Sequence, residues 1–118
     1  MTQEDKELLL KDLCARLPYG VNVESVFINP DTKEHKPCGI EIFDATSLLM
    51  IRDGLGEFKP YLFPLSSMTE EQKEDMIKSS CGIGSDKNVF DWYNKNHFDY
   101  RNLINKNLAI DCTNLNIY

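Results

Sequence analysis

The order in which hydrophobic periodicity changes along the chain is the feature that most constrains its fold. Leucines recur every four residues before Pro18, which predicts an amphipathic helix over about residues 3–17. Short β-rich runs separated by turn residues occupy residues 21–63, and helical spacing returns from Thr69 onward. No internal repeat or linker interrupts the 118 residues. The sequence therefore predicts one α+β domain over residues 1–118.

The first helix is expected to bury one face and to expose the other. Leu9 and Leu13 mark the apolar face, and Thr2 followed by Asp5 provides a variant of the capping box. The opposite face is expected to be solvated, and it carries Glu4, Glu7, Lys11, Asp12 and Arg16.

The middle of the chain predicts a sheet of three or four strands. Short connections between consecutive runs indicate that the sheet is mainly antiparallel. Pro60 lies inside the last run and lacks a backbone N–H, which places that strand at an edge or ends it early. The predicted strands are residues 21–28, 39–43, 47–52 and 58–63.

Two to three helices are expected to follow and to pack on the sheet. The capping box Thr69-Glu70-Glu71-Gln72 starts the first of them, and Gly82 and Gly84 end it. The tail from Leu108 is expected to add a strand or an extended arm. The predicted helices are residues 69–79, a helix beginning at Ser85 or Asp86, and a short helix that Asp99 caps and that holds Leu103 and Ile104.

The charge distribution bears on the partners that the chain can bind. Its formal net charge of −6 disfavours nucleic acid and acidic membrane surfaces. Residues 1–76 hold 15 acidic and 8 basic side chains, whereas residues 77–118 hold 4 acidic and 5 basic ones. With no signal peptide and no apolar run long enough to span a bilayer, we expect a cytoplasmic protein without a membrane partner.

The cysteines predict neither disulfides nor a metal site. Cys14, Cys38, Cys81 and Cys112 are widely scattered, and without an export signal they are interpreted as reduced core thiols. His35 and Cys38 have a spacing that suits two zinc ligands, but no second close pair completes a site. We therefore expect no metal and no cofactor.

Catalytic interpretations rest on few residues. A cysteine nucleophile needs a base and a carboxylate that orients the base. The chain offers these residue types in Cys81 or Cys112, His97 and Asp99. His97 shares a predicted helix face with apolar residues, which favours a partly buried structural histidine over a catalytic one. The glycines of residues 81–87 match no phosphate-loop consensus and fit the end of one helix and the start of the next.

An aromatic cluster is the most informative irregularity of the last third. Five aromatic residues lie within residues 90–100, and most of them are expected to cover the sheet. Trp, Tyr and Arg also dominate interface hot spots, so some of these side chains are expected to meet a partner. The predicted binding residues are Trp92, His97, Tyr100 and Arg101, joined by Tyr61.

Three phrases of the chain resemble a known family. Residues 13–21 (LCARLPYGV), 59–71 (KPYLFPLSSMTEE) and 96–104 (NHFDYRNLI) are similar to a family of small uncharacterised proteins encoded by gut bacteria and their phages and prophages. Phe63 departs from the arginine expected there. The resemblance supplies no activity, cofactor or catalytic residue. It implies a mobile-element context, in which small cytosolic accessory proteins bind host or phage components.

The leading functional hypothesis is therefore a non-enzymatic interaction or accessory protein that binds a protein partner. The alternative is a nucleic-acid-associated protein that uses residues 87–106 as a helix-turn-helix-like reader. A small Cys/His enzyme is the third hypothesis. The sequence allows a monomer or a homodimer, with the edge strand or the C-terminal arm as the place where a dimer forms.

Overall fold

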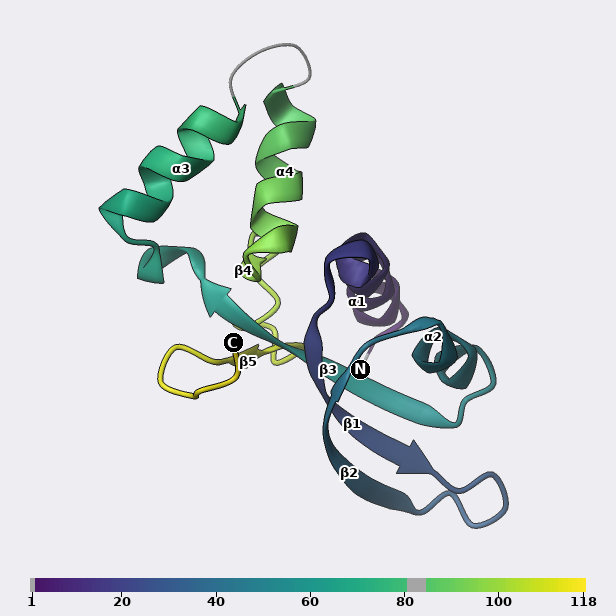
Figure 1. Cartoon of the computed structure of the whole chain (residues 1–118). Coiled ribbons are helices and arrows are strands. Elements are labelled where there is room, and N and C mark those ends of the chain that lie inside the picture. The colour runs from purple at the N-terminus through teal and green to yellow at the C-terminus, as the bar shows by residue number, and fades with distance from the viewer. Residues whose placement is uncertain (1, 81–84) are drawn as a thin grey trace.

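A computed structural model describes residues 2–80 and 85–118 of the chain and confirms the α+β fold class. An N-terminal helix is followed by a sheet with one short helix inserted, and then by a helical pair and a C-terminal arm (Figure 1). The elements are α1 (Gln3–Arg16), β1 (Asn22–Ile28), β2 (His35–Ile42), α2 (Ala45–Arg52), β3 (Gly56–Pro64), α3 (Glu70–Ser80), α4 (Ser85–Lys95), β4 (Phe98–Asp99) and β5 (Ile110–Asp111), with 3-10 turns at Leu17–Tyr19 and Leu65–Ser67.

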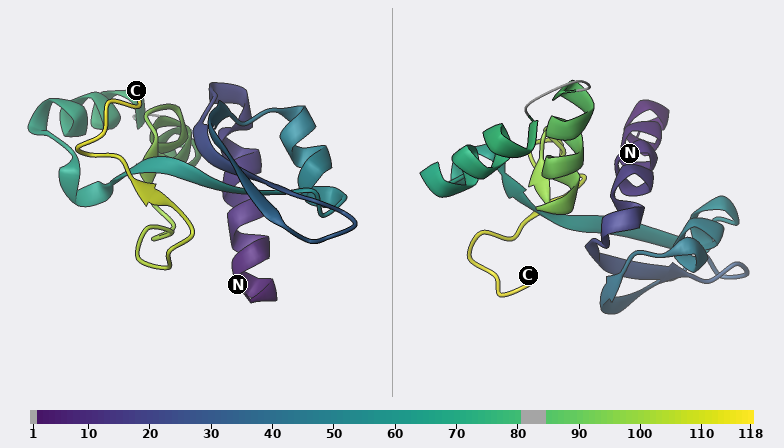
Figure 2. Two further views of the ribbon diagram at one scale, coloured as in Figure 1. Left: turned by 90° about the horizontal axis from the view of Figure 1, so that it is seen from below. Right: turned by 45° about the horizontal axis from the view of Figure 1, so that its top comes forward.

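The sheet is organised around β3. Its strand order is β2-β1-β3-β4, with β5 also paired to β3. The three long strands are antiparallel, as predicted, whereas the two short C-terminal strands run parallel to β3. Helices α1 and α2 lie on the same side of the long strands, and α3 and α4 pack together beyond the end of β3 (Figure 2).

The expectation of a strand over residues 47–52 is wrong, because these residues form α2. Asp44 caps this helix with a full capping box: its carboxylate accepts from the Ser47 N–H at 3.0 Å, and the Ser47 hydroxyl accepts from the Asp44 N–H at 3.2 Å. Leu48 and Ile51, three residues apart, pack against the core while Leu49 between them is exposed. The local cap thus outweighs the β-rich composition of the run.

The effect expected of Pro60 is also wrong. It lies within β3 opposite Val23 of β1, and the strand continues to Pro64. A proline removes one donor from one side of a strand, which leaves the pairing to a neighbour on the other side possible. β3 therefore lies between β1 and β4 in the strand order, with β1 paired to residues 56–60 and the two short strands paired to residues 61–64.

Two of the three helices predicted for the C-terminal part are present in the described residues, α3 and α4, which agrees with the two to three that were expected. The box at Thr69 and Gln72 forms, with hydrogen bonds of 2.8 and 3.2 Å, and α4 begins at Ser85 as predicted. Gly82 and Gly84, which were expected to end the preceding helix, lie outside the described residues. Phe98 and Asp99 form β4 and turns follow them, so the prediction of a short helix capped by Asp99 is wrong.

Asp99 nevertheless caps the segment that follows it. Its carboxylate accepts from the backbone N–H groups of Leu103 and Ile104, each at 2.9 Å. Asn102 and Asn107 adopt left-handed backbone conformations, with φ of 62° and 59°, which interrupt a right-handed helix. The tail then adds β5 and an extended arm, as expected.

The core brings the two parts of the chain together. Leucines of α1 and residues of β1 and β3 pack with Leu103, Leu108 and Ala109 from the C-terminal segment. Tyr118 secures the arm, because its hydroxyl donates to the Tyr61 carbonyl at 2.8 Å and accepts from the Asn22 N–H at 2.9 Å. In the described part of the chain, no helix has the length and apolar character needed to cross a bilayer.

Candidate functional site

Two of the five predicted binding residues are packed inside the protein. Trp92 is 6% exposed, stacks on Phe98 with ring centroids 5.5 Å apart, and donates from Nε1 to Asp75 Oδ2 at 2.8 Å. Tyr61 is buried as well, on β3. Both rings are therefore largely shielded from solvent and offer little surface to a partner.

The other three predicted residues lie around a charged cluster. Tyr100 is half-buried, and its hydroxyl donates to Asn94 Oδ1 at 3.0 Å. The guanidinium carbon of Arg101 lies 4.6 Å from the centre of the Tyr100 ring, and that of Arg16 lies 5.5 Å from it. Tyr100 thus contacts two cations, an arrangement that the aromatic face favours electrostatically.

Asp12 and Arg16 correct the expectation of a solvated helix face, since both side chains are 0% exposed. Arg16 donates from Nε to Asp12 Oδ2 at 2.8 Å and from Nη2 to the Phe98 carbonyl at 2.6 Å. Arg101 adds a donor to Asp12 Oδ1 at 3.2 Å. We call Asp12, Arg16 and Arg101 the Asp12 cluster.

The Asp12 cluster joins α1 to the C-terminal segment. One carboxylate faces two guanidinium groups, and Arg16 Nη1 has no hydrogen-bond partner among the described residues. Sequence reasoning missed this role, although the i,i+4 spacing of Asp12 and Arg16 suits an ion pair. The cluster is a structural tie, because Asp12 on α1 accepts from Arg101 of the C-terminal segment and Arg16 donates to the Phe98 carbonyl.

His97 is half-buried and has a left-handed backbone conformation. Its ring lies parallel to that of Tyr118 with centroids 3.6 Å apart, and its backbone has a φ of 66°. Nδ1 is buried and has no hydrogen-bond partner among the described residues. Burial, and secondarily the nearby positive charge of Arg16, lowers the pKa of His97 to about 4. The imidazole is therefore neutral near pH 7.

This low pKa predicts a pH-dependent contribution to stability. Because the folded-state pKa of about 4 lies below the ordinary value of 6.5, the unfolded chain binds more protons between those values. We expect stability to fall as pH decreases from 6.5 towards 4. His97→Asn, which tolerates the left-handed backbone, should show a smaller fall in urea unfolding over the same range. Equal pH dependence of the two proteins, or an NMR titration of His97 near pH 6.5, would contradict this expectation.

The described cysteines do not form an activated nucleophile. Cys112 is buried, and desolvation followed by the charge of Asp111 raises its pKa to about 11. Cys14 and Cys38 are exposed, which corrects their interpretation as core thiols. Cys81 lies outside the described residues, so the catalytic role considered for it does too.

Thiol reactivity tests this arrangement. In a Cys81→Ser background at pH 7.5, we expect two thiols to react rapidly with a disulfide reagent and the third to react only on unfolding. Removing Cys112 by substitution with serine should abolish the slow phase and leave the fast one, because burial limits both access and thiolate formation. A third fast thiol would contradict the burial of Cys112.

Among the described residues, the structure does not bring together those considered for a metal site or a nucleic-acid site. Across the described ranges, no group of three or more His, Cys, Asp and Glu side chains is arranged to hold a metal ion. His35 instead lies 3.6 Å from the Glu57 carboxylate. The helix-turn-helix hypothesis lacks its second helix, because β4 and turns follow α4. Of its cations, Lys87 pairs with Asp91 at 3.1 Å and Arg101 belongs to the Asp12 cluster.

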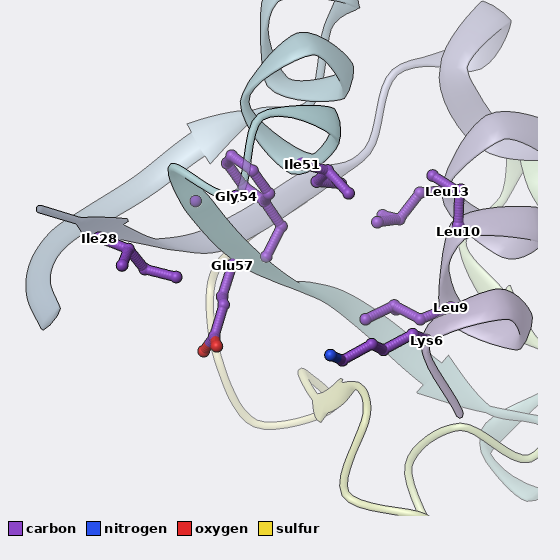
Figure 3. Close-up of a pocket in the computed structure, with 10 residues that line it drawn as sticks. Lys6, Leu9, Leu10, Leu13, Ile28, Ile51, Gly54 and Glu57 are labelled. Carbon is purple, nitrogen blue, oxygen red and sulfur yellow. The ribbon is translucent and has the colours of Figure 1, made fainter. Parts of the chain in front are cut away.

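An apolar groove lies between α1, α2 and the sheet. It has a volume of about 230 Å³ and is partly open to solvent. In Figure 3, Leu9 and Lys6 point from α1 towards β3, and Ile51 lies above them. We call this hollow the α1–α2 groove, and it is lined by Lys6, Leu9, Leu10, Leu13, Ile28, Ile51, Gly54, Gly56, Glu57 and Phe58.

Two opposite charges lie among the apolar lining residues of the α1–α2 groove. Lys6 and Glu57 extend to the same side of it in Figure 3. The Glu57 carboxylate lies 3.6 Å from His35 Nε2, whereas the Lys6 ammonium forms no ion pair within the described ranges. Gly56 allows the Phe58 and Met50 side chains to pack closely on the backbone, because a Cβ there would meet Phe58 Cε2 at 3.0 Å and Met50 Cε at 3.2 Å. The groove therefore combines an apolar floor with one available cation.

The sequence did not single out the α1–α2 groove, since its walls come from four elements that only the fold brings together. Leu9 and Leu13 were recognised as apolar, but as core residues. Comparison with known proteins adds no template for it: no family model matches the chain, and neither a curated protein nor a solved structure matches it.

Proposed function

We propose that this chain is a non-enzymatic, cytoplasmic interaction module that receives an apolar anchor of a partner protein in the α1–α2 groove. The observation that carries the proposal is the groove itself, in which apolar side chains from α1, α2 and two strands surround an open hollow. The neutral His97 and the high pKa of Cys112 also favour binding over catalysis. An accessory role fits the mobile-element context that the family resemblance implies.

The size of the groove favours a protein segment over a cofactor. Small-molecule sites typically enclose about 300–1,000 Å³ and surround most of their ligand. A hollow of about 230 Å³ that is open on one side suits one or two apolar side chains instead. Charge complementarity specifies the residue next to the apolar anchor in the partner, which we call the flank. An acidic flank would pair with Lys6, which with Glu57 is one of two charged residues that line the groove.

Selection from a random peptide library tests this function directly. We expect peptides selected on the wild-type chain to share an apolar anchor next to an acidic residue. Leu10→Asp should weaken their binding about tenfold or more in fluorescence polarisation, because it places a charge in the apolar lining. Leu49→Asp is the matched control, since Leu49 is an exposed leucine of α2 that does not line the groove.

Charge reversal tests the proposed flank separately. Lys6→Glu should weaken binding of the acidic peptides, whereas Lys11→Glu, on an exposed residue of the same helix outside the groove, should have little effect. Failure of the library to enrich any peptide, or equal binding by Leu10→Asp and Leu49→Asp, would overturn the proposed function. Equal effects of the two lysine variants would overturn the acidic flank.

A further inference from the structure

β2 is an edge strand without a cover. It lies at one end of the strand order, and all eight of its residues are exposed. Ile40 and Ile42 are 55% and 66% exposed on the face opposite α1 and α2, where no helix lies over β1 and β2 (Figure 2). An open edge of this kind can pair with another strand.

Hydrogen bonds at the two ends of the β1–β2 pair show which backbone groups are free. The Phe43 N–H donates to the Val21 carbonyl at 2.9 Å, and the Asn29 N–H donates to the Glu34 carbonyl at 2.9 Å. Because hydrogen-bonded and non-hydrogen-bonded pairs alternate along antiparallel strands, the residues that direct their backbone groups away from β1 follow from these ends. They are His35, Pro37, Ile40 and Ile42.

A β-bulge gives β2 an unusual symmetry. Cys38 is the extra residue, since Gly39 pairs with Ser25 and Pro37 pairs with Val26. The bulge places Lys36 and Glu41, five residues apart, on the same face, because their partners on β1 are Phe27 and Val23. The outward-directed residues are likewise distributed evenly about the bulge, two on each side.

This symmetry makes β2 complementary to an antiparallel copy of itself. With a twofold axis between residues 38 and 39, His35 lies opposite Ile42 and Pro37 lies opposite Ile40, so outward-directed groups meet outward-directed groups. Lys36 then lies opposite Glu41 of the second copy, and Glu41 opposite Lys36 of the second copy. Opposite charges at facing positions stabilise an antiparallel pair, and this register provides two such pairs.

We propose that two copies of the chain associate through their β2 edges in this register, which extends the sheet across a homodimer. The proposal concerns a surface separate from the α1–α2 groove. The bulge makes other pairings of this edge unfavourable, because it interrupts the regular spacing of the free backbone groups. In the proposed register the two bulges meet, and only the Pro37 donor is absent.

Sedimentation equilibrium of the full chain tests the register by charge exchange. In a dimer of Lys36→Glu, both facing pairs of positions 36 and 41 consist of two glutamates. In a dimer of Glu41→Lys, both pairs consist of two lysines. Each variant should therefore weaken its own dimer about tenfold or more. When the two variants are mixed, both facing pairs become opposite in charge, and the heterodimer should form with about the wild-type dissociation constant.

Two controls accompany the mixing experiment. Lys33→Glu reverses an exposed charge outside β2 and should leave the dimer unchanged, and circular dichroism shows whether each variant is folded. Leu10→Asp should also leave the dimer unchanged, so failure of the groove and failure of the dimer are separable. A wild-type chain that stays monomeric up to millimolar concentration, or mixed variants that do not associate, would overturn the proposal.

Discussion

Asp12→Ala is expected to lower the free energy of unfolding by about 3–5 kcal/mol in urea denaturation. Asp12 is fully buried and accepts from both Arg16 and Arg101. Its removal leaves the Arg16 guanidinium without a counterion in a site that excludes water, and desolvating an unpaired charge costs more than the pair itself contributes. The loss should therefore exceed what an exposed ion pair provides.

Two comparisons identify the cause of that loss. Glu7→Ala removes an exposed carboxylate of the same helix and should change stability by less than about 0.5 kcal/mol. Replacing Asp12 and Arg16 together by methionine should cost less than Asp12→Ala, because the fully buried Arg16 charge is then removed and the Arg101 side chain, which also loses Asp12, is 17% exposed. If Asp12→Ala and Glu7→Ala have similar stabilities, the Asp12 cluster does not tie α1 to the C-terminal segment.

Phe98→Ala is expected to destabilise the chain by about 3–5 kcal/mol. The Phe98 ring is 1% exposed, stacks on Trp92 with centroids 5.5 Å apart and lies 5.8 Å from the ring of Phe63. Truncation removes the buried apolar contacts of the ring and leaves a cavity that the surrounding side chains fill only in part. Thermal unfolding followed by circular dichroism measures the effect.

Phe90→Ala provides a control of the same chemistry in a different environment. Phe90 is 48% exposed and contacts Tyr100 at 5.1 Å between ring centroids. Its truncation should cost about 1 kcal/mol or less, since about half of its surface already meets water. Comparable losses for the two variants would contradict the division of the aromatic cluster into buried and exposed members.

Local patterns predicted much of the secondary structure. The four-residue spacing of leucines produced α1, and the Thr69 capping box produced the start of α3, because both depend on residues within one or two helical turns. Residues 47–52 were misassigned for a related reason. Their β-rich composition is a weak preference, and the Asp44 cap, which also acts locally, decides against it.

The candidate sites were less accessible to prediction. The aromatic residues of the last third were expected to divide between core and surface, and Trp92 proved to be core because Phe98 and Asp75 complete its environment. Residues of the α1–α2 groove are ordinary apolar side chains in four separate elements. No spacing in the sequence marks them, since their proximity results from how α1 and α2 pack on the sheet.

The sequence by itself determined the fold class, the first helix and its apolar stripe, because periodicity and caps act over a few residues. Only the tertiary structure decided that Asp12 and Arg16 are buried. On an isolated helix their face would meet water, and it is Phe98 and Arg101, more than 80 residues away, that cover it. Burial depends on which distant segments meet, and that is a property of the packed chain.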